Sequence, residues 1–191
     1  MPLIDISGPV GEPVTSAEIK ASARIDGAEF DSQIAIIIPA LRRQAEARTH
    51  RRIMTQTVRL VLDAFPSGEI DLTLPDVTAI VSVKYLDVAG VEQTMANTAY
   101  SMIDVGAKTL PTFLAPAHGT TWPDTYDAAN AVKVEFTVGA ASAAAVPEDI
   151  KLWIIAHACQ VLRLPEGITS GTLAPLPFVD HLLDAYKVWR A

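Results

Sequence analysis

Two kinds of hydrophobic periodicity divide the chain into helical ends and a strand-rich middle. Apolar residues recur at helical spacing from Phe30 to Ala45, and from Ile150 to Leu164 they surround the predicted helix on nearly every side. From Val58 onward, apolar and polar residues instead alternate every second position. This order predicts one α+β domain over residues 1–191. Its helices, at about 15–52 and 147–190, form a small bundle, and an antiparallel β-sheet or sandwich lobe is inserted at about 55–138.

The first helix has a clear start signal. Thr15 and Glu18 have the spacing of a capping box, and Val14 is placed to pack on Ile19 as a hydrophobic staple. We expect this helix to be short and to end near Arg24.

A second, longer helix is predicted to follow and to reach about Thr49. Asp26 and Glu29 repeat the capping-box spacing before its apolar stripe. Pro39 lies inside that stripe, where it removes one backbone hydrogen bond and clashes with the carbonyl of Ala35. We therefore expect a kink or a break there.

Short turns separate the predicted strands and favour an antiparallel arrangement. The strands are expected at about 58–62, 70–74, 80–87, 91–95, 100–103, 109–114 and 132–137. An alanine-rich linker at 139–145 then leads to Pro147, at the first position of a helix that should be buried on most sides.

The stretch from Leu176 to Arg190 predicts a further amphipathic helix. Its apolar residues fall on one helical face: Val179, Leu182, Leu183, Tyr186 and Trp189. Chain ends commonly fray unless something holds them. Such a segment must dock on its own core or on another protein. Trp189 and Arg190 are residue types enriched in interface hot spots, which favours a partner.

Composition and charge narrow the function. The 191 residues are 50% hydrophobic, 6% aromatic and 19% charged, which is typical of a globular protein. The net charge of −7 argues against a dedicated nucleic-acid binder, although not against a protein that surrounds DNA. The single cysteine, Cys159, excludes an internal disulfide and a cysteine-based zinc site. With no signal peptide and no membrane-spanning run, we expect a soluble product made in the cytoplasm.

Five arginines, a third of the basic residues, are concentrated in the eleven positions 42–52, at the end of the predicted second helix. They are Arg42, Arg43, Arg48, Arg51 and Arg52. A solvated helix end, where cations are favoured by the helix dipole, is the simpler interpretation. The other is a basic rim that meets DNA or pairs with acidic groups of a neighbouring subunit.

No motif indicates catalysis or metal binding. His157 and Cys159 are two residues apart and point to different faces of a helix, and His181 with Asp184 fits a solvated pair. The sequence contains no HExxH, GxSxG or phosphate-loop motif in a supporting context. We expect no enzyme activity and no cofactor. The alternative is a small-molecule-binding or hydrolytic α+β domain whose polar site is dispersed along the chain.

Several short motifs in a fixed order resemble a known family. They are EPVT at 12–15, RID at 24–26, QTVRL at 56–60, VSVKYLD at 81–87, GVEQT at 90–94, WP at 122–123, VPEDIK at 146–151 and YKVWR at 186–190. Together they resemble the head–tail connector, or adaptor, proteins of tailed bacteriophages and prophages, in the subgroup with a β insertion that is also found in gene transfer agents. Pro39 departs from the uninterrupted second helix of that family.

The resemblance implies a structural protein of the virion neck, assembled in the host cytoplasm. Such proteins form a ring, commonly of twelve subunits, beneath the portal protein, and join a tail-side connector or stopper protein. DNA passes through the ring without specific binding, and the five arginines would be channel or inter-subunit contacts. The C-terminal segment would bind the portal through Phe178, Val179, Leu182, Leu183, Tyr186, Val188, Trp189 and Arg190.

Overall fold

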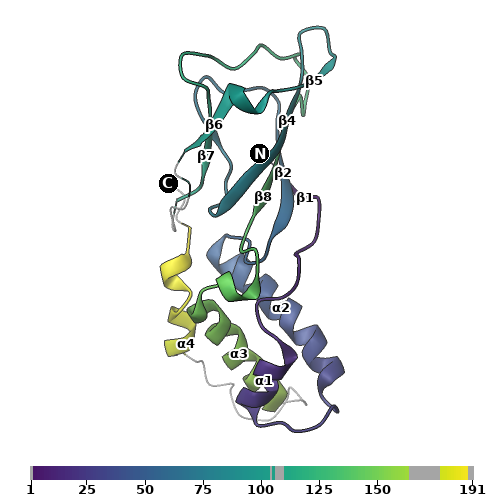
Figure 1. Cartoon of the computed structure of the whole chain (residues 1–191), viewed down its shortest axis with the longest axis vertical. Helices are drawn as coiled ribbons and strands as arrows, with labels where there is room; N and C mark the ends of the chain where they lie inside the picture. Colours follow the sequence, from purple (N-terminus) through teal and green to yellow (C-terminus); the bar gives the residue numbers. More distant parts are fainter. Residues whose placement is uncertain (1, 104, 106–109, 164–176, 189–191) are drawn as a thin grey trace. The chain divides into compact units, whose positions relative to one another are not determined.

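The computed structural model describes residues 2–103, 105, 110–163 and 177–188, and it confirms the predicted α+β class (Figure 1). Two compact units are formed. The β unit contains residues 1–10, 55–139 and 188–191, and the helical unit contains residues 11–54 and 140–187. Its helices are α1 (Ser16–Ala23), α2 (Asp31–Thr49), α3 (Glu148–Arg163) and α4 (Pro177–His181). The strands are β1 (Leu3–Asp5), β2 (Gln56–Leu62), β3 (Ile70–Asp71), β4 (Val77–Leu86), β5 (Glu92–Thr94), β6 (Tyr100–Ile103), β7 (Phe113–Pro116) and β8 (Val132–Val138).

The β unit consists of two antiparallel sheets. One has the strand order β1-β2-β8-β4-β5 and the other the order β3-β7-β6. Val58, Val134 and Phe136 of the first sheet and Ile70 and Leu114 of the second belong to one buried hydrophobic cluster. This shared core makes the unit a small sandwich, in which the last strand in sequence, β8, lies between β2 and β4.

Two predicted strands differ clearly from their expected bounds. Ile70, Leu72 and Leu74 are all buried as the alternation predicts, but β3 ends at Asp71. The Asp71 side chain accepts a hydrogen bond of 2.7 Å from the backbone N–H of Thr73, whose φ of 65° is left-handed. This local turn breaks the strand. The strand predicted at 109–114 begins only at Phe113, and residue 109 lies outside the described part.

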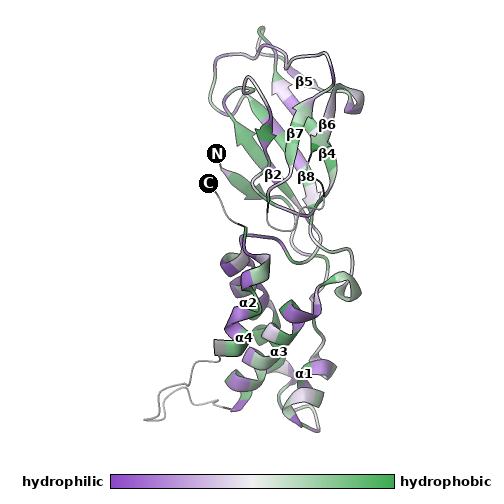
Figure 2. Cartoon of the chain, turned by 90° about the vertical axis from the view of Figure 1, so that its left-hand side faces the viewer, coloured by the Kyte–Doolittle hydropathy of each residue, from purple (hydrophilic) through white to green (hydrophobic). Residues whose placement is uncertain are grey.

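The start of α1 is as predicted. Glu18 N–H donates to Thr15 Oγ1 at 3.2 Å, and Thr15 N–H donates to Glu18 Oε2 at 2.6 Å, so the capping box is complete. Val14 and Ile19 are buried, and the helix ends at a left-handed Arg24. Each helix of this unit carries both hydrophobic and hydrophilic residues (Figure 2). Buried hydrophobic residues of α1, α2 and α3 form one shared core.

The predicted start of α2 is wrong, and the helix does not break at Pro39. The helix begins at Asp31 after an N-cap Phe30 that makes no side-chain capping bond, so Asp26 and Glu29 form no capping box there. It also continues through Pro39 to Thr49. The backbone carbonyl that Pro39 leaves unpaired belongs to Ala35, which is exposed, so water can bind it there.

Candidate partner-docking segment

The segment after residue 176 is not the single helix that its spacing predicts. After α4, a tight turn leads into a short 3-10 helix, η3 (Asp184–Tyr186). Its backbone bonds join residues three apart: Leu182 N–H to the carbonyl of Val179 at 3.1 Å, and Tyr186 N–H to that of Leu183 at 3.0 Å. We call residues 177–188 the docking segment. Leu176, Trp189 and Arg190 lie outside the described residues.

Apolar contacts attach this segment to the helical unit. Leu183 is 1% exposed and is part of the hydrophobic cluster of that unit, and Val179 and Tyr186 pack against the same cluster. Phe178 is different, because 76% of it is exposed. Leu182 is half-buried. Of the two possibilities left open by the sequence, the structure therefore shows docking on the chain's own core, with one large aromatic side chain left outside.

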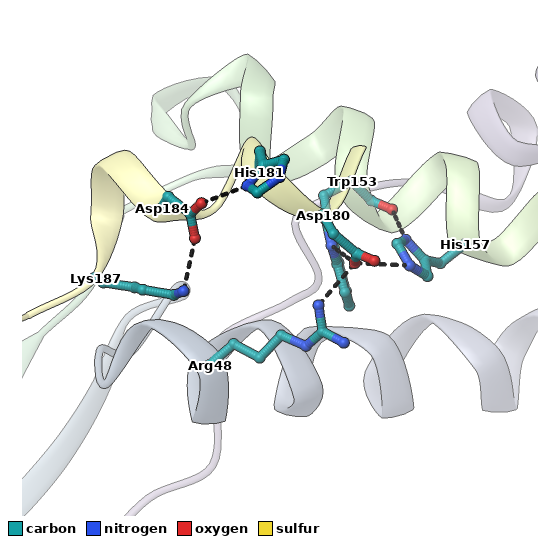
Figure 3. Close-up of polar contacts among 7 residues, drawn as sticks. All are labelled: Arg48, Trp153, His157, Asp180, His181, Asp184 and Lys187. Atoms are coloured by element: carbon teal, nitrogen blue, oxygen red, sulfur yellow. Dashed lines mark hydrogen bonds and ion pairs between the residues drawn. The ribbon is translucent and has the colours of Figure 1, made fainter. Parts of the chain in front are cut away.

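A polar cluster around Asp180 holds α4 against α2 and α3 (Figure 3). Arg48 Nη1 of α2 lies 2.7 Å from Asp180 Oδ1, and Trp153 Nε1–H of α3 donates to the same oxygen at 3.3 Å. His157 Nε2 lies 3.4 Å from it, and the His157 ring stacks on Trp153 at 4.1 Å. Although partial desolvation raises the pKa of Asp180, hydrogen bonds from Arg48 and Trp153 outweigh it and lower the pKa below its usual range.

A second contact, between Arg51 and Tyr186, holds the segment near its end. Arg51 donates from Nε at 3.0 Å and from Nη2 at 2.7 Å to the backbone carbonyl oxygen of Tyr186, and its guanidinium carbon lies 5.4 Å from the Tyr186 ring centroid. The Tyr186 hydroxyl donates to Asp149 at 2.9 Å. Burial, followed by this hydrogen bond to Asp149, raises the pKa of Tyr186. One arginine thus fixes both the backbone and the ring of Tyr186.

The exposed edge of the segment carries its own ion pairs. Asp184 lies 2.8 Å from His181 Nδ1 and 2.6 Å from Lys187 Nζ, each three residues away (Figure 3). The hydrogen bonds from Lys187 and His181 lower the pKa of Asp184. The solvated His181–Asp184 pair expected from the sequence is therefore present.

The five arginines do not form one solvated helix end. Arg42 and Arg51 are each 5% exposed, and Arg42 pairs with Glu12 at 2.9 Å and with Glu46 at 3.0 Å. Arg48 and Arg51 hold the docking segment, and Arg52 is half-buried. Arg43 is exposed and has no ion-pair partner among the described residues. We call the contacts of Arg48 and Arg51 with the docking segment the arginine clamp. The sequence did not suggest this role, because Asp180 and Tyr186, which the two arginines contact, are 132 and 135 residues away.

The described residues contain no group of three or more His, Cys, Asp and Glu side chains that could hold a metal ion. Within this part of the chain, no helix combines the length and the apolar character needed to cross a membrane.

The class of fold is thus a helical unit into which an antiparallel β sandwich is inserted. Three solved chains share it over their length. One belongs to the neck of an empty gene transfer agent (GTA) particle computed with C6 symmetry (22% identity, TM-score 0.81), and one to the virion of a native GTA particle (24%, 0.79). The third belongs to the neck of a native GTA particle computed with C12 symmetry (24%, 0.74). Each match covers 100% of this chain and 97% of the other. No family model matches the chain, and a search of curated proteins finds no match.

The contribution of Arg51 to the arginine clamp can be tested by substitution. Arg51→Ala should lower the free energy of unfolding by about 1.5–3 kcal/mol, because it removes a charged hydrogen-bond donor from the part-buried carbonyl of Tyr186. Urea denaturation gives this value, and limited proteolysis should cut faster near Lys187. Arg43→Ala, at an exposed position of the same run, should change stability by no more than about 0.5 kcal/mol. Equal effects of the two substitutions would contradict the clamp.

Docking of α4 should also depend on pH. Because the folded state lowers the pKa of Asp180, its carboxylate stabilises docking above the unfolded value of about 3.9, and this contribution is lost as the pH falls through the folded pKa. The hydrogen-exchange protection factors of residues 177–187, which correct for the intrinsic slowing of exchange in acid, should fall between pH 6 and pH 3. Asp180→Asn should already exchange faster at pH 6 and should lose the pH-dependent step; a step that persists in this variant would exclude Asp180 as its source.

Proposed function

We propose that this protein is a structural subunit of the neck of a phage-like or gene-transfer particle, forming a ring beneath the portal protein as a head–tail connector. The observation that carries this proposal is the likeness of the entire fold, at a TM-score of 0.81 and with 97% of the other chain covered, to a chain of a GTA neck. The sixfold and twelvefold symmetries of the two neck structures support a ring of copies, commonly twelve. A tail-side connector or stopper protein would bind its other end.

The charge of the chain suits a channel wall. A net charge of −7 disfavours tight binding of the DNA that passes through the ring, because tight binding to phosphates requires a basic surface. Four of the five clustered arginines are also buried, half-buried or engaged in the docking segment, which leaves Arg43 as the exposed cation of that run without an ion-pair partner in the described part of the chain.

The portal would bind the docking segment. Phe178 is the strongest candidate contact among the described residues, because it is 76% exposed on a segment that is otherwise held in place. Leu183, Val179 and Tyr186 would position the segment from the core side. Leu182, Trp189 and Arg190 complete the proposed contact set. Val188 is only 4% exposed and would help to position the segment instead of touching the portal.

The test is assembly with the portal protein of the same particle. Size exclusion with light scattering and electron microscopy should show a ring of this chain on the portal. Phe178→Ser should weaken the complex about tenfold or more without unfolding the protein, as expected for an aromatic anchor. Val88→Ser, which replaces a side chain of similar exposure (69%) in the β unit, should have no effect. A protein that stays monomeric and unbound with the portal present would overturn the proposal.

A further inference from the structure

One face of α3 is apolar but uncovered. Leu152 is 48% exposed, and Ile155, Ala156 and Cys159 are partly exposed at i+3, i+4 and i+7 from it. The sequence makes this helix apolar on nearly every side, as in a helix buried all round. Among the described residues, the helical unit covers the opposite face, including Trp153, and leaves Leu152 exposed, while Ile155 is partly buried and packs against the edge of the same cluster. A second surface is needed to bury this face.

One face of α2 is also uncovered and carries a single charge. Ile36 is 72% exposed, and Ala40, Arg43 and Ala47 follow at i+4, i+7 and i+11, all exposed. The alanines allow another helix to approach closely. Arg43 has no ion-pair partner among the residues that the structure describes.

These two faces lie on opposite sides of the helical unit. α2 and α3 pack together through the faces that contain Ile34 and Ile38 on one helix and Ile150 and Ile154 on the other. The uncovered faces are the reverse sides of the same two helices. Two different surfaces that point apart are what a head-to-tail contact between copies requires, because such contacts close into a ring by rotation.

We propose that the α2 outer face of one copy binds the α3 outer face of the next. This inference rests on the proposed ring and names the surfaces that would form it. Charge and spacing support an antiparallel pairing. Ile36 and Arg43 are seven residues apart, as are Glu148 and Ile155, which is about 10 Å along a helix. Reversed against each other, Arg43 meets Glu148 while Ile36 meets Ile155.

Glu148 is free enough to accept this partner. Its side chain is 84% exposed, and the contact that holds it is a 2.9 Å pair with Lys151 three residues along the same helix. Lys151 is the more buried partner, with a side chain 11% exposed, and the Glu148 carboxylate faces solvent. Arg43 of a neighbouring copy can therefore add to this pair from the solvent side.

Cross-linking tests the pairing directly. In a Cys159→Ser background, Ala40→Cys combined with Leu152→Cys should give a ladder of covalent oligomers with a short bismaleimide when the protein is assembled on the portal. Either cysteine alone should give no ladder, because the two faces differ. Ala40→Cys combined with Val161→Cys is the matched control: Val161 is 43% exposed on the same helix but points to another side.

A charge exchange provides the second readout. Arg43→Glu and Glu148→Arg should each reduce ring assembly about tenfold, since like charges then face each other, and the double variant should recover most of it. Rings on the portal without the cross-linked ladder would overturn this inference and leave the proposed function standing. Dimers from a single cysteine would overturn it in favour of a two-fold contact. No ring under any condition would overturn both.

Discussion

Replacing Glu46 by alanine is expected to lower the free energy of unfolding of the helical unit by about 3–5 kcal/mol. Glu46 Oε2 lies 3.0 Å from Arg42 Nη1, and Glu46 Oε1 accepts a 3.0 Å hydrogen bond from the backbone N–H of Ile53. Both side chains of the ion pair are almost fully buried, with exposures of 6% and 7%. The substitution leaves the buried Arg42 guanidinium with Glu12 as its one ion-pair partner among the described residues, and it removes the acceptor of the Ile53 N–H.

Urea denaturation followed by circular dichroism and tryptophan fluorescence measures this loss. Glu46→Gln should cost about half as much, because the amide oxygen can still accept from Ile53 or Arg42 while the charge is gone. Gln44→Ala, at an exposed position of the same helix, should stay within about 0.5 kcal/mol of the unchanged protein. If Glu46→Ala also stayed within that range, the buried pair would contribute nothing to stability.

Local signals were predicted well from the sequence because their physics involves near neighbours. The capping box of Thr15 and Glu18 requires only four consecutive residues, and it formed as expected. The same spacing at Asp26 failed, although it looks identical in the sequence. There the chain leaves α1 through a left-handed Arg24 and turns again at Gly27, with φ of 95°, so the next helix starts five residues later than Asp26.

Pairing between distant strands left no comparable signal. The alternation around β4 and β8 predicts two strands, but not that β8 inserts between β2 and β4. Two register shifts in β4, between Val77 and Ala79 and between Ile80 and Ser82, also turn Val81 outward, where it is 55% exposed. Such bulges depend on the partner strand and cannot be read from one strand's pattern.

The docking segment shows the same limit for helices. Its apolar period fits one long helix, yet Leu183 is anchored in the core, and Asp184 pairs with both His181 and Lys187 in a tighter turn. The sequence identified the right segment as one that must dock. It could not identify the surface, since the Arg48 contact joins residues 132 positions apart.

Trp153→Ala is expected to have a comparably large effect, about 3–5 kcal/mol, and to release the docking segment as well. Trp153 is 0% exposed at the centre of the helical core. It also donates to Asp180 at 3.3 Å, stacks on His157 and lies under the Arg48 guanidinium, whose carbon is 5.4 Å from its ring centroid. Removing the indole therefore opens a cavity in the core. It also removes the side chain that contacts Asp180, His157 and Arg48, the three other members of the polar cluster that holds α4.

Trp153→Phe separates these two effects. It keeps most of the buried ring but lacks the N–H, so stability should fall by only about 1–2 kcal/mol, while hydrogen exchange in residues 177–187 should still accelerate. Ile154→Val, a smaller change at the neighbouring fully buried position, is the matched control: it should cost about 0.5–1.5 kcal/mol and leave exchange of the docking segment unchanged. If Trp153→Phe left exchange of the segment unchanged, the indole hydrogen bond would not hold α4, and Arg48 would be its main polar anchor.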